Sequence, residues 1–153
     1  MSKISEEIVR FFYDQGCVIV STIDENGFPS SSCKGIVEID HDGHVYLLDL
    51  YRGRTWSHLQ KNPHICITAI DEHRFTGYSL KGKARIVTNE EFKPHLLKAW
   101  EDRIASRLTK RVLKNLRGEK GHAAHPEALM PEPEYLIAMD VEEVIDLAPR
   151  HSK

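Results

Sequence analysis

The sequence predicts a mainly β protein, built as a small barrel with helices at its periphery. Between residues 17 and 88, runs of β-branched and apolar residues alternate with short turn signals. Gly77 and Gly82 lie inside the longest of these runs, as a strongly curved sheet requires. Helical patterns are too few to cover a parallel, doubly wound sheet. With 153 residues, 41% of them hydrophobic and 29% charged, the chain is expected to form one soluble domain over residues 1–153.

The first element is expected to be an amphipathic helix over residues 3–15. Glu6 and Glu7 suit its first turn, and Gly16 is placed to end it. Its apolar side chains recur at helical spacing on one face: Ile4, Ile8, Phe11 and Phe12.

The barrel is expected to use residues 17–88 and 134–147. Asn26-Gly27 is a hairpin turn signal, and residues 40–43 form a second turn. The final strand is expected to bend near Glu142. The predicted strands are residues 17–23, 30–39, 45–50, 64–70, about 74–87 and about 135–147.

A helical segment is predicted over residues 89–118. The TNEE sequence at residues 88–91 fits a capping box, and an apolar series that includes Leu96 and Trp100 follows it. Pro94 marks either a kink or the true first turn of this helix.

Composition and missing motifs exclude several function classes. The net charge of −2 gives no general attraction to nucleic acid or an acidic membrane, and no signal-peptide or bilayer-length apolar run occurs. Rossmann, P-loop, α/β-hydrolase and zincin motifs are absent from the sequence. Cys17, Cys33 and Cys66 lie in strand-like runs, so we expect reduced, partly buried thiols in a cytoplasmic protein.

Two further patterns favour ordinary surface chemistry. Among nine histidines, His41 with His44 and His122 with His125 come in pairs, but no ligand partners stand at metal-binding spacing, so no metal is expected. The segment from 103 to 120 is rich in arginine and lysine at helical spacing. Such a face can bind an anion, but without interleaved aromatic residues it is more typical of a solvated helix face.

The strongest candidate site is the short helix expected within residues 51–63. Arg54 and Thr55 stand at its start, and Asn62-Pro63 ends it. The free N–H groups and positive end of a helix favour an anionic group, above all a phosphate. The alternative is an ordinary capped turn with a surface arginine.

The second candidate is the small-residue run SSSCKG at residues 30–35. Small side chains allow a flat ligand to approach the backbone, and Lys34 can face a group that becomes negative. The alternative is an edge strand that its lysine protects against aggregation.

Together these segments resemble the FMN-binding split-barrel family related to pyridoxamine 5′-phosphate oxidase. The resemblance covers about residues 4–100, with a plausible last strand after residue 134. It is carried by TIDENGFP at residues 22–29, RTWSHLQKNP at residues 54–63, LKGKA at residues 80–84 and the acidic capped helix that follows.

The resemblance implies a six-stranded antiparallel Greek-key barrel that pairs into a homodimer, with one FMN at each end of the interface. Arg54 and Thr55 would hold the phosphate. The other implied contacts are Ser32, Cys33, Lys34 and Gly35 along the ribityl chain and ring edge, Leu48 and Asp49 at the ring or ribityl hydroxyls, and Gly77 or Tyr78 on the fifth strand.

Departures from the family pattern limit what carries over. Thr55 stands where members often have a second phosphate lysine, Gly77 replaces a glutamine of the oxidase, and its C-terminal substrate-binding segment is not recognised. One extra residue near Tyr51 leaves the register of Leu48 and Asp49 open by one. A pyridoxamine phosphate oxidase in the strict sense is therefore not expected.

The sequence thus leads to an FMN-binding oxidoreductase that uses a reduced nicotinamide donor, with no catalytic residue nominated. A flavin carrier or sensor without a substrate pocket is the alternative, as is a member of the same superfamily that binds the deazaflavin F420 or haem.

Overall fold

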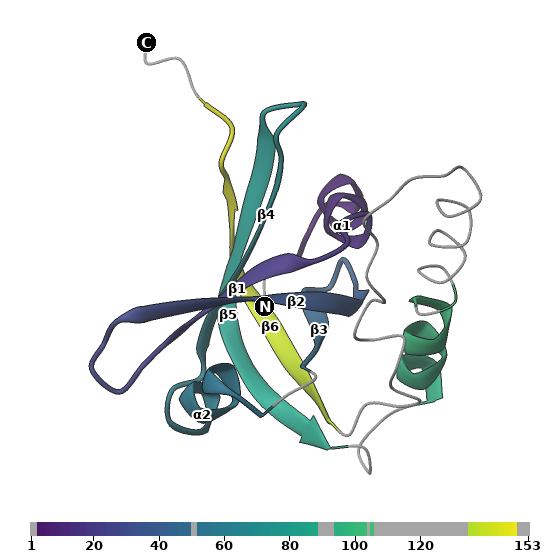
Figure 1. The fold of residues 1–153 in the computed structure, drawn as a ribbon. Helices are drawn as coiled ribbons and strands as arrows, with labels where there is room; N and C mark the ends of the chain where they lie inside the picture. Colours follow the sequence, from purple (N-terminus) through teal and green to yellow (C-terminus); the bar gives the residue numbers. More distant parts are fainter. Residues whose placement is uncertain (1–2, 50–51, 89–93, 104, 106–134, 150–153) are drawn as a thin grey trace, which may run out of the picture.

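Six antiparallel strands close into a barrel in the order β1-β2-β3-β6-β5-β4 (Figure 1). The computed structural model describes residues 3–49, 52–88, 94–103, 105 and 135–149. The elements are α1 (Glu6–Tyr13), β1 (Val18–Ile23), β2 (Pro29–Ile39), β3 (His44–Leu48), α2 (Arg54–Lys61), β4 (His64–Asp71), β5 (Thr76–Thr88) and β6 (Tyr135–Asp146). The predicted fold class, a mainly β six-stranded antiparallel barrel, is confirmed.

Two hairpins of the barrel turn by the same local chemistry. The Oδ1 atom of Asp24 accepts hydrogen bonds from the backbone N–H groups of Asn26 and Phe28, at 2.8 and 2.9 Å. Asp40 plays the same part in the next turn. Gly27 and Gly43 hold φ angles of 82° and 95°, which side chains disfavour. The Asn26-Gly27 signal therefore marks a real turn.

The longest strand pair, β5 with β6, contains the predicted irregularity. Lys81 pairs with Glu143 but Gly82 pairs with Val141, so Glu142 is the extra residue of a bulge on β6. A Cβ atom on Gly82 would lie 1.9 Å from the carbonyl oxygen of Asp140. The glycine therefore lets the two strands approach where the sheet bends.

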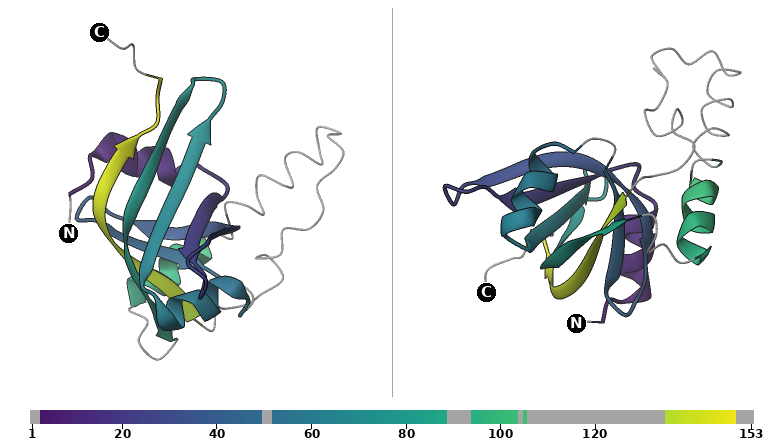
Figure 2. Two further views of the ribbon diagram at one scale, coloured as in Figure 1. Left: turned by 90° about the vertical axis from the view of Figure 1, so that its left-hand side faces the viewer. Right: turned by 90° about the horizontal axis from the view of Figure 1, so that it is seen from below.

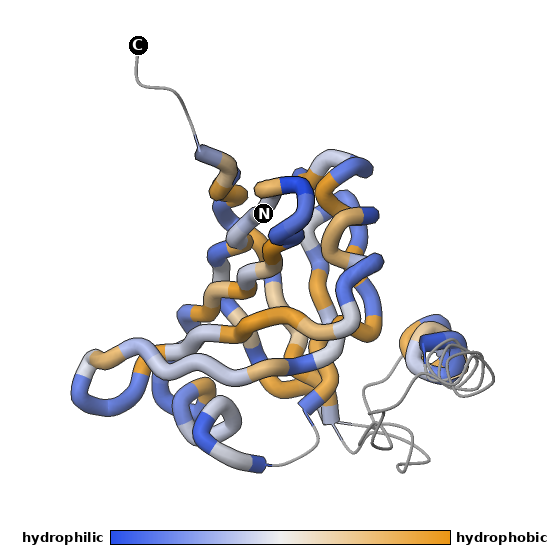
Figure 3. Tube along the Cα trace, turned by 45° about the horizontal axis from the view of Figure 1, so that its top comes forward, coloured by the Kyte–Doolittle hydropathy of each residue, from blue (hydrophilic) through white to orange (hydrophobic). Residues whose placement is uncertain are grey.

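The barrel interior is the main core, and α1 packs against it at one end. Val20, Leu47, Ile67 and Leu80 are fully or almost fully buried there, and Phe12 of α1 joins the same cluster. The first helix is shorter than the expected residues 3–15, because the Ser5 side chain caps it at Ile8 N and Asp14 ends it. In Figure 3 the hydrophobic segments follow the strands, and the first hairpin turn is hydrophilic.

A second, smaller cluster lies outside the barrel wall. Val37, Leu48 and Leu136, one from each of β2, β3 and β6, pack against Trp100. Trp100 belongs to the helix that the structure describes from residue 94, so Pro94 is its first described residue. Most of the predicted segment 89–118 lies outside the described residues. Figure 2 shows the described part of this helix beside the barrel.

Candidate functional site

The helix α2 begins with an open, uncapped turn. Gly53 is its N-cap, no side chain caps the first turn, and no acidic residue stands in it. Arg54 is exposed, whereas Thr55 is buried. Because the first N–H groups of a helix lack intrahelical partners, this end can hold an anion beside a cationic side chain.

Two side-chain hydrogen bonds fix α2 on the barrel. The Thr55 hydroxyl shares a 3.1 Å hydrogen bond with the Ser32 hydroxyl of β2. One turn later, Nδ1 of His58 lies 2.9 Å from the hydroxyl of buried Thr22 on β1. The start of α2 is thereby placed against the small-residue run of β2, although the two are far apart in sequence.

Lys34 and Asp49 form a buried ion pair close to this junction. The Lys34 Nζ donates to Asp49 Oδ1 at 2.8 Å, with 8% and 5% of the two side chains exposed. The second carboxylate oxygen of Asp49, Oδ2, is buried and has no hydrogen-bond partner in the part of the chain that the structure describes. Lys34 therefore does not offer an isolated positive charge.

Strand register decides which predicted residues face this site. Gly35 and Leu48 are Cα partners, which brings the ends of the SSSCKG run and of β3 together. Leu48 itself packs in the outer cluster with Trp100, and Cys33 is exposed. Ser32, Lys34, Asp49 and Thr55 thus meet in space, while the side chains of Cys33 and Leu48 lie on the other face of the wall.

Gly77 and Tyr78 lie at the opposite end of β5 from α2. Gly77 pairs with Ile70 beside the β4–β5 hairpin, whereas α2 leads into the start of β4 (Figure 1). Tyr78 packs edge-on against Phe11 of α1, at 5.2 Å between ring centroids. It lines a polar hollow of about 680 Å³. Within one chain these two residues do not join the other site residues.

The environment of Tyr78 is negative rather than positive. Burial, together with the nearby carboxylates of Glu7 and Asp146, raises the pKa of the Tyr78 phenol above its ordinary value. The hollow that it lines carries five acidic side chains and two arginines. A phosphate is therefore disfavoured at this end of the barrel.

Sequence reasoning missed Arg52 and His58. The Arg52 guanidinium stacks over the Trp56 ring at 4.7 Å and lies 5.6 Å from the Tyr135 ring, which adds a second cation beside the start of α2. His58 fixes α2 through Thr22. The sequence signal for both residues was their position relative to Arg54. Arg52 lies two residues before it, and His58 lies one helical turn after it.

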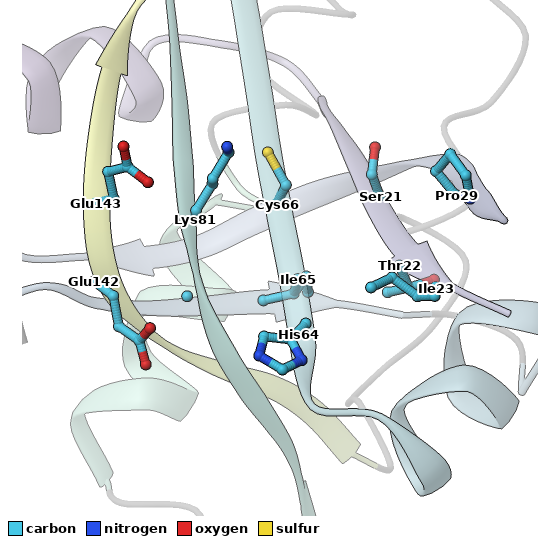
Figure 4. A pocket seen from close by; sticks show the side chains of 11 residues that line it. Ser21, Thr22, Ile23, Pro29, His64, Ile65, Cys66, Lys81, Glu142 and Glu143 are labelled. Atoms are coloured by element: carbon cyan, nitrogen blue, oxygen red, sulfur yellow. The ribbon is translucent and has the colours of Figure 1, made fainter. Parts of the chain in front are cut away.

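A second hollow, of about 380 Å³, lies on the outer face of the sheet (Figure 4). Lys81 is its one lysine, and Glu142 and Glu143 stand beside it on β6. Ser21 and Cys66 contribute small side chains from β1 and β4. Its acidic excess makes it a poorer phosphate site than the start of α2.

The remaining sequence predictions concern the cysteines, metal binding and the basic stretch. Cys17 and Cys33 are exposed and Cys66 is half-buried, so the expectation that all three thiols are partly buried was wrong for the first two. Within the described ranges no group of three histidine, cysteine, aspartate or glutamate side chains could hold a metal, and no helix is long and apolar enough to cross a membrane. His122, His125 and the basic stretch beyond residue 105 lie outside the described residues.

Solved structures share this fold at low sequence identity. HupZ of Group A Streptococcus is 19% identical with a TM-score of 0.62, and the match covers 95% of each chain. An F420 reductase is 11% identical with a TM-score of 0.55, covering 93% of this chain and 98% of its own. HutZ, the haem storage protein of Vibrio cholerae, is 15% identical with a TM-score of 0.54, covering 94% of both chains.

The family assignment comes from a protein-family model that matches the sequence. No curated protein matches the chain. The model of the family described as pyridoxamine 5′-phosphate oxidase matches residues 4–147, which includes every strand of the barrel and both α1 and α2. The chain therefore belongs to the pyridoxamine 5′-phosphate oxidase family.

Proposed function

We propose that this chain binds FMN and works as a small homodimeric oxidoreductase that accepts electrons from a reduced nicotinamide donor. The observation that carries the proposal is the open start of α2, with Arg54 exposed and Thr55 hydrogen-bonded to the small-residue strand β2. When bound, FMN supplies the electron transfer, and the protein supplies binding and electrostatic tuning.

The phosphate end of FMN suits the first turn of α2. A doubly charged phosphate is best held by charge-assisted donors, and here the Arg54 guanidinium adds to free helix N–H groups. The Thr55 hydroxyl can turn from Ser32 toward the ligand. Arg52, stacked on Trp56, adds positive potential from the preceding residues.

The rest of the cofactor would follow β2 toward β3. Ser32 and Lys34 lie on one side of this strand, and Gly35 removes side-chain bulk where β2 meets β3. Cys33 and Leu48 would contribute through their backbone, since their side chains face elsewhere. Asp49 offers an open acceptor oxygen.

Gly77 and Tyr78 would reach a flavin only from the partner subunit of a homodimer. The outer face of the sheet carries exposed apolar side chains, with 45% of Ile19 and 62% of Ile70 exposed. Ile19 and Thr68 are direct partners, which places Ile70 on the same face two residues further along β4. We infer that this face is covered by a second copy, which would bring its own β5 toward the site.

The test of the function is a titration of the apoprotein with FMN, followed by flavin fluorescence. Arg54→Ala is expected to weaken FMN binding by about ten- to a hundredfold, which corresponds to the loss of a charge-assisted hydrogen bond. Lys61→Ala, which removes an exposed cation at the far end of α2, is the matched control and is expected to bind as the parent does. Unchanged affinity in Arg54→Ala would contradict the phosphate assignment.

Three alternatives remain for the same site. A carrier or sensor would bind FMN without being reduced by NADH or NADPH at a useful rate. The names of the F420 reductase and of HutZ favour testing the deazaflavin F420 and haem as well. Competition binding among FMN, F420 and haemin shows which of these ligands the site prefers. A haem complex would be identified by its Soret absorbance band.

Two thiols support a reducing compartment. Cys33 and Cys66 form no disulfide, and Cys33 is exposed. Disulfides are rare in cytosolic proteins, where thiols are kept reduced. We therefore place the proposed flavoprotein in the cytoplasm.

A further inference from the structure

Strand β2 contains a bulge just after the small-residue run. Ile36 is the Cα partner of Leu47 on β3. The next pair joins Glu38 to Tyr46, so Val37 is an extra residue on β2. A bulge of this kind bends its strand and shifts, by one residue, the alternation of side chains between the two faces of the sheet.

The bulge decides which way the small-residue run faces. Ile36 and Ile39 both belong to the barrel core although they are three residues apart, which regular alternation does not allow. Before the bulge, Ser32 and Lys34 share the face of Ile36, because alternate residues of a strand point the same way. Cys33 is exposed instead. A strand without the bulge, in register with Ile39, would turn Lys34 outward and Cys33 inward.

The helix that begins at residue 94 lies beside the barrel and contacts this bulge twice (Figure 2). Trp100, of which 4% is exposed, packs in the outer cluster with Val37. Three residues later, Nε of Arg103 donates a hydrogen bond to the carbonyl oxygen of Ile36 at 3.1 Å. Residues three apart lie on one face of a helix. The helix therefore holds both the side chain and the backbone of the bulge.

Arg103 joins the same bulge to the end of α1. Its Nη1 and Nη2 atoms donate to the carbonyl oxygens of Tyr13 and Gln15, at 2.7 and 3.1 Å, and the guanidinium lies 4.7 Å from the centre of the Tyr13 ring. The last carbonyl groups of a helix have no intrahelical partner, so a cationic donor suits this place. A rigid guanidinium can serve three carbonyls at once, whereas lysine offers one compact charge on a flexible stem.

We propose that Arg103 is a positioning residue of the cofactor site, which fixes the β2 bulge in the register that directs Lys34 toward the flavin. This inference rests on the proposed FMN function. Arg103 acts through the backbone of Ile36, two residues from Lys34. It governs the part of the site formed by β2, whereas the Arg54 side chain and the N–H groups of α2 would hold the phosphate independently of the bulge.

A purely structural role for Arg103 has a different consequence. Loss of three hydrogen bonds that only stabilise the fold would lower the free energy of unfolding, but the molecules that stay folded would bind every part of the cofactor as before. A positioning role predicts weaker FMN binding by the folded protein, with unchanged affinity for a phosphate group alone. The two ends of the site therefore have to be measured separately.

The experiment titrates Arg103→Ala with FMN and uses inorganic phosphate as a competitor. The dissociation constant of FMN is expected to rise by about three- to thirtyfold, while the inhibition constant of phosphate stays within about twofold of the parent value. Millimolar guanidinium chloride should restore part of the FMN affinity, and the same concentration of sodium chloride should not. Lys98→Ala removes an exposed cation from the same helix and should match the parent throughout.

Arg103→Lys is the second variant, and it decides the question if the alanine variant does not fold. It keeps a cation but not the rigid fork, so FMN affinity is expected to fall here as well. Circular dichroism shows whether each variant is folded at the temperature of the titration. Folded variants that bind FMN as tightly as the parent, or that lose FMN and phosphate affinity equally, would overturn the inference and leave the FMN function intact. Failure of the parent to bind FMN would overturn the proposed function and this inference with it.

Discussion

Lys34 and Asp49 carry opposite charges in a place that water hardly reaches. With 8% and 5% of their side chains exposed, each depends on the other, because an unpaired buried charge is strongly unfavourable. The exposed pairs of this protein are different. Lys61 and Glu25 lie 3.5 Å apart with more than two thirds of each side chain in solvent. The Lys34–Asp49 pair is therefore both shorter and far more buried than the exposed pair.

Replacement of Lys34 by methionine is expected to lower the free energy of unfolding by about 3–5 kcal/mol, because it leaves the Asp49 carboxylate buried without a counter-charge. Lys61→Met should change it by less than about 1 kcal/mol, since that pair is exposed. Urea denaturation of the two variants in parallel measures both values. Equal losses would show that the buried pair does not contribute as described.

At the scale of elements, the bulge between β5 and β6 shapes the barrel wall. Glu142 is the extra residue on β6, and Gly82 faces it on β5, too close to the Asp140 carbonyl for any side chain. The outer helix is held by another specific contact, since Arg103 donates to the carbonyl oxygens of Ile36, Tyr13 and Gln15. That arginine therefore ties the helix to both β2 and the end of α1.

Gly82→Ala is expected to destabilise the protein severely, because its Cβ would meet backbone atoms that cannot move aside independently. Gly16→Ala is the matched control. A Cβ at residue 16 meets nothing within 4 Å, so alanine there should leave stability unchanged or raise it by up to about 1 kcal/mol. Thermal unfolding followed by circular dichroism distinguishes the two. A fully stable Gly82→Ala would mean that β5 and β6 are further apart than described.

At the scale of the whole molecule, the outer face of the sheet bears on whether one chain can form the complete cofactor site. The start of α2 gathers Ser32, Lys34, Asp49 and Thr55, but Gly77 and Tyr78 lie at the far end of β5. A site that uses both groups needs two copies. The exposed Ile19 and Ile70 give the face on which those copies would meet.

Ile70→Asp is therefore expected to convert the proposed dimer to a monomer and to weaken FMN binding at the same time. His41→Asp adds the same charge at the exposed β2–β3 turn and should change neither property. Light scattering coupled to size-exclusion chromatography measures the mass, and fluorescence titration measures the affinity. A monomeric parent protein that binds FMN tightly would contradict the two-subunit site.

The strands and α2 could be predicted from the sequence because their signals are local. The Asn26-Gly27 turn, the stop at Asn62-Pro63 and the glycine inside β5 each act within a few residues. The pair of Lys34 with Asp49 joins residues 15 apart through the β2–β3 register, which no local pattern specifies. The same applies to the outward packing of Leu48 on Trp100, which depends on a helix that follows β5.

Closure of the barrel also limits how two copies can join. Each of the six strands has a neighbour on both sides, but residues 29–34 of β2 pair with β1 alone and residues 141–146 of β6 pair with β5 alone. On the outer face around Ile19 and Thr68, β1 and β4 are paired on both sides, so a second copy that covers this face would dock there through side chains. Subunits that meet through side chains can separate without breaking backbone hydrogen bonds between strands. Each chain can therefore fold first, and the two copies can assemble later, when the cofactor binds.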